Sequence, residues 1–382
     1  MRVSKLAKVA AIALAFGVVA ATPAFALDLQ GSGSSFAAGL MEGCKAPFAA
    51  SGSNTYTYAS SSSGTGQANS DKSIGDFWMS DGAYTAATKR ASLIHVPLVA
   101  APIALLTNLP GSKTLQLSAK TIAGIFGGTI TKWNDPAIVA DNNKSATVVI
   151  YKKDASGNLK KDAAGKPVVL RTATTTSRYT LPNKPIQVIY RLDSSGTTQN
   201  FTNFLNKSAP TVWTKSAAKV FMTSFPGDIN AAGSIGRIVG ATSSTGVATL
   251  AGKTSYSITY AEVNYAVANK LKVANVINAA GSSVKPDSIG VAAFLASATQ
   301  DANGWLTFNY TTTEVGAYPL GIVSYLLADT NYPSKTTAAA VSALAKFILS
   351  PACADKIGSD LGFSLIEGDL LKKSLVQVAK IG

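Results

Sequence analysis

The stretch RLDSSGTTQNF, residues 191–201, lies between an apolar run, IQVIY (186–190), and FTNFLNKS (201–208), whose Phe and Leu recur at helical spacing. The apolar run predicts a strand and the later segment a helix, so the stretch is a strand-to-helix turn. It holds an arginine, an acid, two serines, a glycine and two threonines. Because the N–H groups at a helix start lack intrahelical partners and attract anions, the turn predicts a cluster of hydrogen-bond donors.

The same order of strand, polar glycine turn and helix recurs near the N-terminus. LDLQGSGSSF (27–36) leads into a helix-like segment, FAAGLMEGCKAPFAAS (36–51), and NTYTYA (54–59) leads through SSSSGTG (60–66) into QANSDKSIGDF (67–77). A further apolar run, FWMSDGAYT (77–85), stops at Asp81 and Gly82. This alternation predicts an α/β protein with mainly parallel sheets.

Two long apolar runs, VPLVAAPIALLTNLPG (96–111) and AYPLGIVSYLLA (317–328), are candidates for crossings between lobes. We therefore expect two lobes, one made of residues 27–100 with 315–382 and the other of residues 101–314. Within the second lobe, SAKTIAGIFGG (118–128) predicts a helix capped by Ser118. Residues 141–186 have two β-rich arms around a charged, glycine-containing tip, which predicts a hairpin insertion.

Residues 1–26 are typical of a cleaved signal peptide. Arg2, Lys5 and Lys8 precede the apolar run VAAIALAFGVVAA (9–21), and small residues surround the end of the segment at AFA (24–26). No cysteine follows at a lipidation position, and no later stretch has the length of a membrane-spanning helix. We expect a periplasmic or secreted monomer without membrane insertion.

The charge balance favours an anionic partner. The formal net charge is +14, and removing the three positive charges of the signal peptide leaves 14 − 3 = +11 for the mature chain. Nucleic acid is not the expected partner, because the basic residues are scattered and aromatic stacking motifs are missing. With 47% hydrophobic and 14% charged residues, the chain can bury a large core.

Cysteine and histidine usage limits the chemistry. Cys44 and Cys353 are the only cysteines, and in an oxidising compartment such a pair is more often bridged than free, although two buried thiols are the alternative. The one histidine, His95, lies in an apolar strand-like run, so we expect it to be a packed core residue. We expect no metal site, no cofactor and no enzymatic activity.

Taken together, these motifs resemble the PstS-type phosphate-binding proteins, which capture inorganic phosphate for the permease of an ABC importer. The segment around Trp133 and the turn at residues 191–197 are the most specific carriers. All the carriers are GSGSSF (31–36), SGTG (63–66), SDG (80–82), KTIAGIFGGTITKWNDPAI (120–138), RLDSSGTT (191–198), SITYAEVNYA (257–266) and YPL (318–320). The resemblance implies a type II periplasmic binding protein fold, whose two lobes enclose the ligand.

The resemblance also implies a set of phosphate ligands. They combine hydroxyl groups, backbone amides, one acid and one arginine: Ser35, Phe36, Ser63, Asp81, Arg191, Ser195, Gly196 and Thr197. Asp193 matches the acid that holds the arginine in place, and Ser62 is the alternative to Ser63 in the serine run. Mono- and dihydrogen phosphate can donate a hydrogen to the carboxylate of Asp81, whereas sulfate cannot. An unpaired buried carboxylate costs about 3–5 kcal/mol, which predicts a strong preference for phosphate.

Two other interpretations of the function remain open. The exported DING-type proteins share the architecture, so the chain could be a phosphate scavenger or surface protein without a transporter. A phosphoester hydrolase is the alternative from another class, and the shortage of metal ligands and general bases argues against it.

Overall fold

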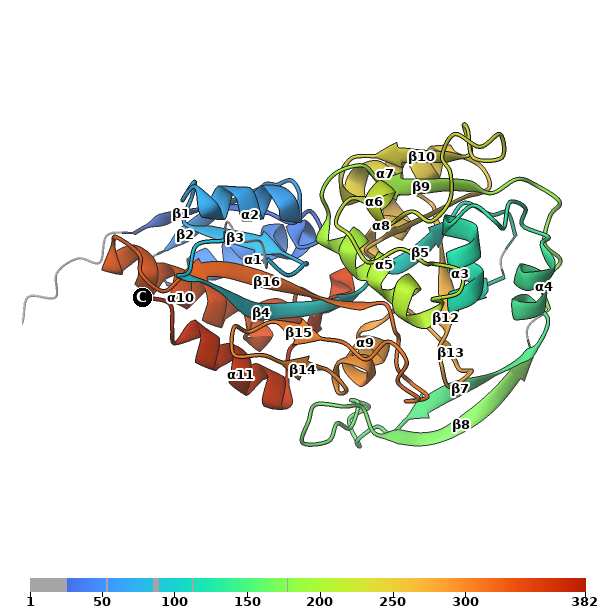
Figure 1. Cartoon of the computed structure of the whole chain (residues 1–382). Coiled ribbons are helices and arrows are strands. Elements are labelled where there is room, and N and C mark those ends of the chain that lie inside the picture. Colours follow the sequence, from blue (N-terminus) through green and yellow to red (C-terminus); the bar gives the residue numbers. More distant parts are fainter. Residues whose placement is uncertain (1–25, 53, 85–88, 112, 177) are drawn as a thin grey trace, which may run out of the picture.

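The structure is a computed structural model that describes residues 26–52, 54–84, 89–111, 113–176 and 178–382. Figure 1 shows two α/β lobes lying side by side, with a long hairpin along one edge of the molecule. The predicted signal peptide lies outside the described residues, apart from Ala26. Within those residues, the helices are too short or too polar for any of them to cross a bilayer.

The first lobe is built on a sheet in which parallel strands carry the polar turns. Its order is β17 (Ser364–Leu365), β4 (Leu93–Pro102), β16 (Gly321–Asp329), β3 (Phe77–Ser80), β1 (Asp28–Gly33) and β2 (Thr55–Ser60). β1 runs parallel to both β2 and β3, whereas β16 is antiparallel to β3 and β4. The carboxyl ends of β1, β2 and β3 therefore meet at one edge.

The second lobe has a sheet of the same kind. Its order is β10 (Ile238–Ala241), β9 (Gln187–Arg191), β11 (Ser257–Ala261), β5 (Ala104–Thr107), β12 (Lys272–Ile277) and β13 (Ser283–Val284), and β6 (Gln116–Ser118) pairs with β12. β9 is parallel to β10 and β11, so the end of β9 lies between two other strand ends. β5 is antiparallel to β11 and β12.

The predicted α/β class and two-lobed architecture are confirmed, but the sheets are mixed rather than mainly parallel. Most antiparallel pairs involve a strand of the predicted crossing runs, β4 and β16 in one lobe and β5 in the other, and β12 also pairs antiparallel with β13. β4 and β16 are buried along their full lengths, and β4 leads almost directly into β5 of the other lobe (Figure 1). A wholly buried strand has no alternation of polar and apolar residues, so its direction is hard to infer from sequence.

Helices cover both sheets, and several of them begin at the polar turns. Around the first sheet lie α1 (Ala38–Ser51), α2 (Ser63–Asp71), α9 (Ser288–Leu295), α10 (Lys335–Ile348) and α11 (Gly368–Val378), with a π-helical turn at Pro351–Asp355 and a 3₁₀ turn at Ser359–Leu361. The second lobe has α3 (Ala119–Phe126), α4 (Pro136–Asn142), α5 (Gly196–Ser208), α6 (Phe221–Ser224), α7 (Ser243–Lys253) and α8 (Asn264–Ala268).

Serine caps fix where several of these helices start. The Ser118 hydroxyl accepts a hydrogen bond from the amide of Thr121, which confirms the predicted cap of α3. The Ser62 hydroxyl accepts from the amide of Thr65, so α2 begins at Ser63, four residues earlier than the segment expected to be helical. An N-cap side chain satisfies a free helix amide, and here it outweighs the low helix propensity of the glycines that follow.

The segment predicted as a hairpin insertion, 141–186, contains β7 (Ser145–Tyr151) and β8 (Val169–Thr176), which pair antiparallel. The tip of this hairpin reaches the first lobe, where Lys161 forms an ion pair with Glu367 at 2.5 Å. The predicted lobe bounds stay a prediction. α9 lies within residues 101–314, which were predicted to form the second lobe, but it packs against β4, β16 and β17 of the first lobe.

The predicted disulfide is confirmed: Cys44 in α1 and Cys353 in the π-helical turn are bonded and fully buried, with Cα atoms 5.4 Å apart. The bond joins residues separated by 309 positions. It therefore closes nearly the whole mature chain into one loop, which restricts the unfolded state strongly.

We expect removal of this bond to lower the free energy of unfolding by about 2–5 kcal/mol. The test is guanidinium unfolding of the Cys44→Ala/Cys353→Ala variant beside the wild type, with and without reductant. Reduction should destabilise the wild type to a similar extent and leave the variant unchanged. Equal stability of the oxidised wild type and the variant would show that the bond contributes nothing.

Candidate functional site

The first lobe places a buried carboxylate at the edge where β1, β2 and β3 end. Asp81 follows β3 and is 2% exposed. Its Oδ2 accepts hydrogen bonds from the hydroxyls of Ser34, at 2.5 Å, and Ser63, at 3.1 Å, and its Oδ1 accepts one from the hydroxyl of Ser324. Three neutral donors from three segments of the chain therefore converge on one carboxylate.

This arrangement leaves the carboxylate able to bind one more donor. Burial raises the pKa of Asp81, while the hydroxyls of Ser324, Ser34 and Ser63 and the charge of Arg191 act to lower it. A carboxylate offers about four lone-pair positions, of which three are occupied by these serines. Asp81 can thus share a hydrogen with one further group inside the cleft.

The second lobe contributes a buried cation at the end of β9. Arg191 is 1% exposed, and its Nε donates to Asp193 Oδ1 at 2.7 Å while its Nη2 donates to Asp193 Oδ2. Its Nη1 donates to the hydroxyl of Ser244, at the start of α7, at 3.1 Å. Hydrogen bonding and attraction to Asp193 raise the pKa of Arg191 despite the opposing effect of burial. The two-point contact fixes the plane of the guanidinium group.

The start of α5 lies directly against the first lobe. Ser195 caps the helix by accepting a hydrogen bond from the amide of Thr198 at 3.2 Å. A Cβ atom on Gly196 would lie 2.5 Å from the amide nitrogen of Gly82, so only glycine allows this approach. The hydroxyl of Thr197 is buried and has no hydrogen-bond partner among the described residues. The amides of the first helical turn point outward from the helix end, as an anion site requires.

The remaining predicted residues lie around the same point. The hydroxyl of Ser35 lies 3.4 Å from that of Ser244 and accepts from the Ser244 amide at 3.3 Å. The amide of Phe36 donates to the hydroxyl of Ser34 at 3.0 Å. Of the two alternatives in the serine run, Ser63 contacts Asp81 and Ser62 caps α2. The structure thus brings every predicted ligand residue to one region, with Ser62 turned to the helix end.

Several contacts join the two lobes here, so the cleft is closed. The amide of Gly64 donates to the carbonyl of Ser194 at 2.9 Å, and Nδ2 of Asn200 in α5 donates to the carbonyl of Asp81 at 2.6 Å. At the rim, Lys219 donates to the side chain of Gln67. Asp81 and Arg191 are therefore both shielded from bulk water. Electrostatic interactions in such a buried region are stronger than at the surface.

Sequence reasoning missed four residues of this site: Ser34, Ser244, Ser324 and Glu262. Ser34 stands in the quoted glycine-serine turn, and Ser324 is a polar residue inside a long apolar run, which is a usable signal. Ser244 lies at a helix start without any marked motif. Glu262 directly follows β11 and is 2% exposed, with no hydrogen-bond partner for either carboxylate oxygen in the described structure.

His95 lies in β4, outside this cluster, and behaves as the predicted core histidine. It is 3% exposed, and its Nε2 accepts a hydrogen bond from the amide of Tyr84 at 3.1 Å. Burial, assisted by the charge of Lys89, lowers its pKa to about 4. The imidazole is therefore neutral at neutral pH.

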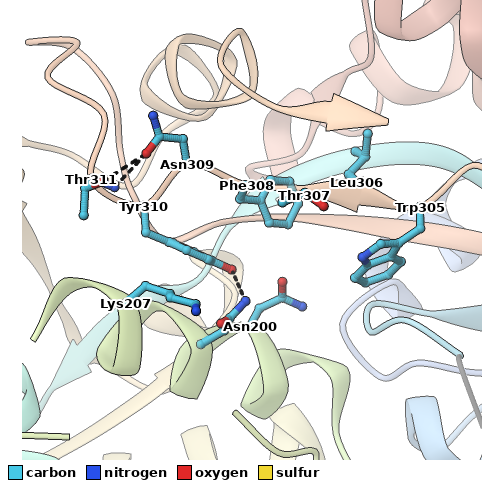
Figure 2. Close-up of a pocket in the computed structure, with 10 residues that line it drawn as sticks. Asn200, Lys207, Trp305, Leu306, Thr307, Phe308, Asn309, Tyr310 and Thr311 are labelled. Atoms are coloured by element: carbon cyan, nitrogen blue, oxygen red, sulfur yellow. Dashed lines mark hydrogen bonds between the residues drawn. The ribbon is translucent and has the colours of Figure 1, made fainter. Parts of the chain in front are cut away.

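A cavity of about 320 Å³ lies next to this cluster, between α5 and residues 305–311 (Figure 2). Figure 2 shows Lys207 and Tyr310 near each other at the left of the view and Trp305 at the right. The wall of the cavity includes Asn200, whose amide donates to the carbonyls of Asp81 and Gly196. Because that amide is already engaged and the wall lacks a buried arginine or carboxylate, the cavity is separate from the Asp81–Arg191 cluster.

The matching family model and the similar proteins agree on one family. The model of the PBP superfamily domain matches residues 19–352. The phosphate-binding protein PstS 2 of Mycobacterium tuberculosis is 31% identical over 262 residues, which are 67% of this chain and 58% of that protein. The phosphate-binding protein PstS of Xylella fastidiosa is 28% identical over 308 residues, covering 79% and 71% of the two chains. The chain thus spans somewhat more than half the length of the mycobacterial relative.

Solved structures have the same fold. The periplasmic phosphate-binding protein PfluDING, determined with bound phosphate, aligns with a TM-score of 0.64 and 23% identity over 90% of this chain and 92% of that one. An ABC-type phosphate transport receptor from Vibrio cholerae aligns with a TM-score of 0.51 and 14% identity over 88% and 99% of the two chains. At these identities the alignments establish a shared fold.

Proposed function

This chain belongs to the PBP superfamily, and from that premise we propose that it binds inorganic phosphate between its two lobes. The observation that carries the proposal is that a buried carboxylate of one lobe, Asp81, lies close enough to a buried arginine of the other lobe, Arg191, for the charge of Arg191 to lower the pKa of Asp81. Both side chains are almost fully buried, and each is hydrogen-bonded to at least one serine hydroxyl. The proposed ligands are those predicted from sequence: Ser35, Phe36, Ser63, Asp81, Arg191, Ser195, Gly196 and Thr197.

Neutral donors supply most of the binding in this proposal. Arg191 is already paired with Asp193, so the site adds no net positive charge from this pair. A dehydrated phosphate is then stabilised by hydroxyls and by the amides at the starts of α1 and α5, which need not be desolvated as charges. The hydroxyl of Thr197, which has no partner in the described part of the chain, gains one when the anion binds.

Asp81 gives the site its selectivity. A phosphate at neutral pH carries at least one hydrogen, and the free position on the Asp81 carboxylate accepts it. Sulfate has no hydrogen to donate, so its oxygen would meet a carboxylate in a buried site. The resulting repulsion and lost hydrogen bond cost about 3–5 kcal/mol.

We further propose that the protein is exported and delivers phosphate to the permease of an ABC importer, acting as a binding protein and not as an enzyme. The relatives named as phosphate-binding proteins support this proposal, as does the structural likeness to a phosphate transport receptor. Hinge motion about the β4–β5 link would open and close the cleft.

Titration calorimetry with phosphate and with sulfate tests the proposed function. The protein is first freed of bound anion by unfolding, dialysis and refolding. We expect phosphate to bind at least about a hundredfold more tightly than sulfate, since 3 kcal/mol corresponds to that ratio. No phosphate binding, or equal affinity for the two anions, would contradict the proposal.

A further inference from the structure

Glu262 is a buried acid next to the proposed ligands that has no role in the function proposed so far. It directly follows β11, which is parallel to β9, so it lies beside the end of the strand that carries Arg191. It is 2% exposed, and among the described residues neither carboxylate oxygen has a hydrogen-bond partner. An ionised carboxylate in such a place would be strongly destabilising.

The groups around Glu262 come from several elements. Burial raises its pKa to about 8, while the charge of Arg191 and the nearby Ser244 hydroxyl lower it and the charge of Asp81 raises it. Tyr265 in α8 is also near, because the charge of Glu262 raises the pKa of its phenol. Asp193 accepts hydrogen bonds from Nε and Nη2 of Arg191. The carboxyl group is thus poised to change its charge close to neutral pH.

The charges of the cleft favour a neutral Glu262 whenever an anion is bound. With Glu262 ionised, the carboxylates of Asp81, Asp193 and Glu262 outnumber the one guanidinium group of Arg191 by two. With Glu262 protonated, the excess is one. An incoming anion adds further negative charge to the same buried space, so it binds more tightly to the protonated form.

A protonated Glu262 would also complete the hydrogen bonding of Ser244. The hydroxyl oxygen of Ser244 accepts from Arg191 and can accept one more hydrogen. If Glu262 supplies it, both lone pairs of that oxygen are used and the Ser244 hydrogen is left to point toward Ser35 and the anion. Ser244 and Ser35 are already neighbours across the two lobes.

On the basis of the proposed phosphate site, we propose that Glu262 is a positioning residue that must carry its proton for phosphate to bind. As a neutral carboxylic acid it donates its hydrogen to Ser244 and directs the Ser244 hydroxyl toward the ligand. When Glu262 ionises, the cleft gains a negative charge and loses this donor. Phosphate affinity is therefore coupled to one proton held by the protein.

The test compares phosphate binding by the wild type and Glu262→Gln from pH 6 to pH 9.5. Glutamine is a neutral donor of the same shape and does not titrate. Below about pH 7 the two proteins should bind alike. The dissociation constant of the wild type should then rise about tenfold by pH 9 relative to that of Glu262→Gln, because one proton is linked to binding. The ionisation of phosphate itself affects both proteins equally and cancels in this ratio.

Glu314→Gln is the matched control, because Glu314 pairs with Lys166 of the hairpin tip. It should keep the wild-type pH profile. Identical pH profiles for the wild type and Glu262→Gln would overturn the role of Glu262 while leaving the proposed function intact. Absence of phosphate binding by the wild type at every pH would instead overturn the proposed function.

Carbon-13 labelling of the glutamate side-chain carboxyls alone tests the proposal on the wild type itself, should Glu262→Gln fail to fold. The chain contains four glutamates, Glu42, Glu262, Glu314 and Glu367, so the spectrum is simple. We expect one carboxyl resonance to titrate near pH 8 in the anion-free protein and at higher pH once phosphate is added. If no resonance titrates above pH 6, or if phosphate leaves the titration unchanged, the proposal is wrong.

Discussion

Asp81→Asn is expected to abolish most of the preference for phosphate over sulfate. The asparagine amide can donate a hydrogen bond to a sulfate oxygen, which the carboxylate cannot do. Sulfate should therefore bind more tightly than it does to the wild type. The ratio of the sulfate to the phosphate dissociation constant should fall roughly a hundredfold, which corresponds to about 3 kcal/mol of selectivity. Calorimetric titration of both anions into both proteins measures this ratio.

Asp329→Asn is a suitable control for the Asp81 experiment. Asp329 is a buried aspartate of the same lobe, but it pairs with Arg90 away from the cleft. Its substitution should lower stability and leave the phosphate-to-sulfate ratio unchanged. If Asp81→Asn also leaves the ratio unchanged, Asp81 is not the group that selects the anion.

Arg191→Ala is expected to weaken the binding of phosphate and other oxyanions by about a hundredfold or more. The substitution removes the cation of the cleft and leaves the Asp193 carboxylate unpaired beside the ligand. Breaking a buried ion pair in this way costs about 3–5 kcal/mol. Because Arg191 recognises charge and not the hydrogen of phosphate, selectivity should change much less than affinity.

Two further variants isolate the charge effect in the Arg191 experiment. Arg191→Ala/Asp193→Ala removes the unpaired carboxylate as well and should recover part of the lost affinity. Arg237→Ala removes a buried arginine that donates to backbone carbonyls elsewhere in the second lobe, and it should affect stability alone. Wild-type phosphate affinity in Arg191→Ala would exclude Arg191 from the site.

The parts of the site that lie within one turn could be predicted from the sequence. Arg191, Asp193 and the start of α5 are encoded by a single strand-to-helix stretch, and the capping serine marks where the helix begins. The same holds for the turn after β1, where Ser35 and Phe36 lie. Short-range patterns specify such turns because their hydrogen bonds join neighbouring residues.

The parts that depend on long-range pairing could not be predicted in this way. The hydroxyl of Ser324 reaches Asp81 from a strand that is 243 positions away in the chain. That strand, β16, pairs antiparallel with β3 and β4, and nothing in its apolar sequence indicates this direction. The contacts of Ser244 and Glu262 likewise depend on how β9, β11 and α7 pack together, which propensity alone does not specify.

A crystal structure of the protein with bound phosphate tests the central claim most directly, because that claim concerns a hydrogen bond between Asp81 and the ligand. We predict one phosphate oxygen at about 2.5–2.7 Å from a carboxylate oxygen of Asp81, the range of a hydrogen bond from a hydroxyl to a carboxylate. A phosphate bound elsewhere, or one whose oxygens all lie beyond hydrogen-bonding distance of Asp81, would contradict the account.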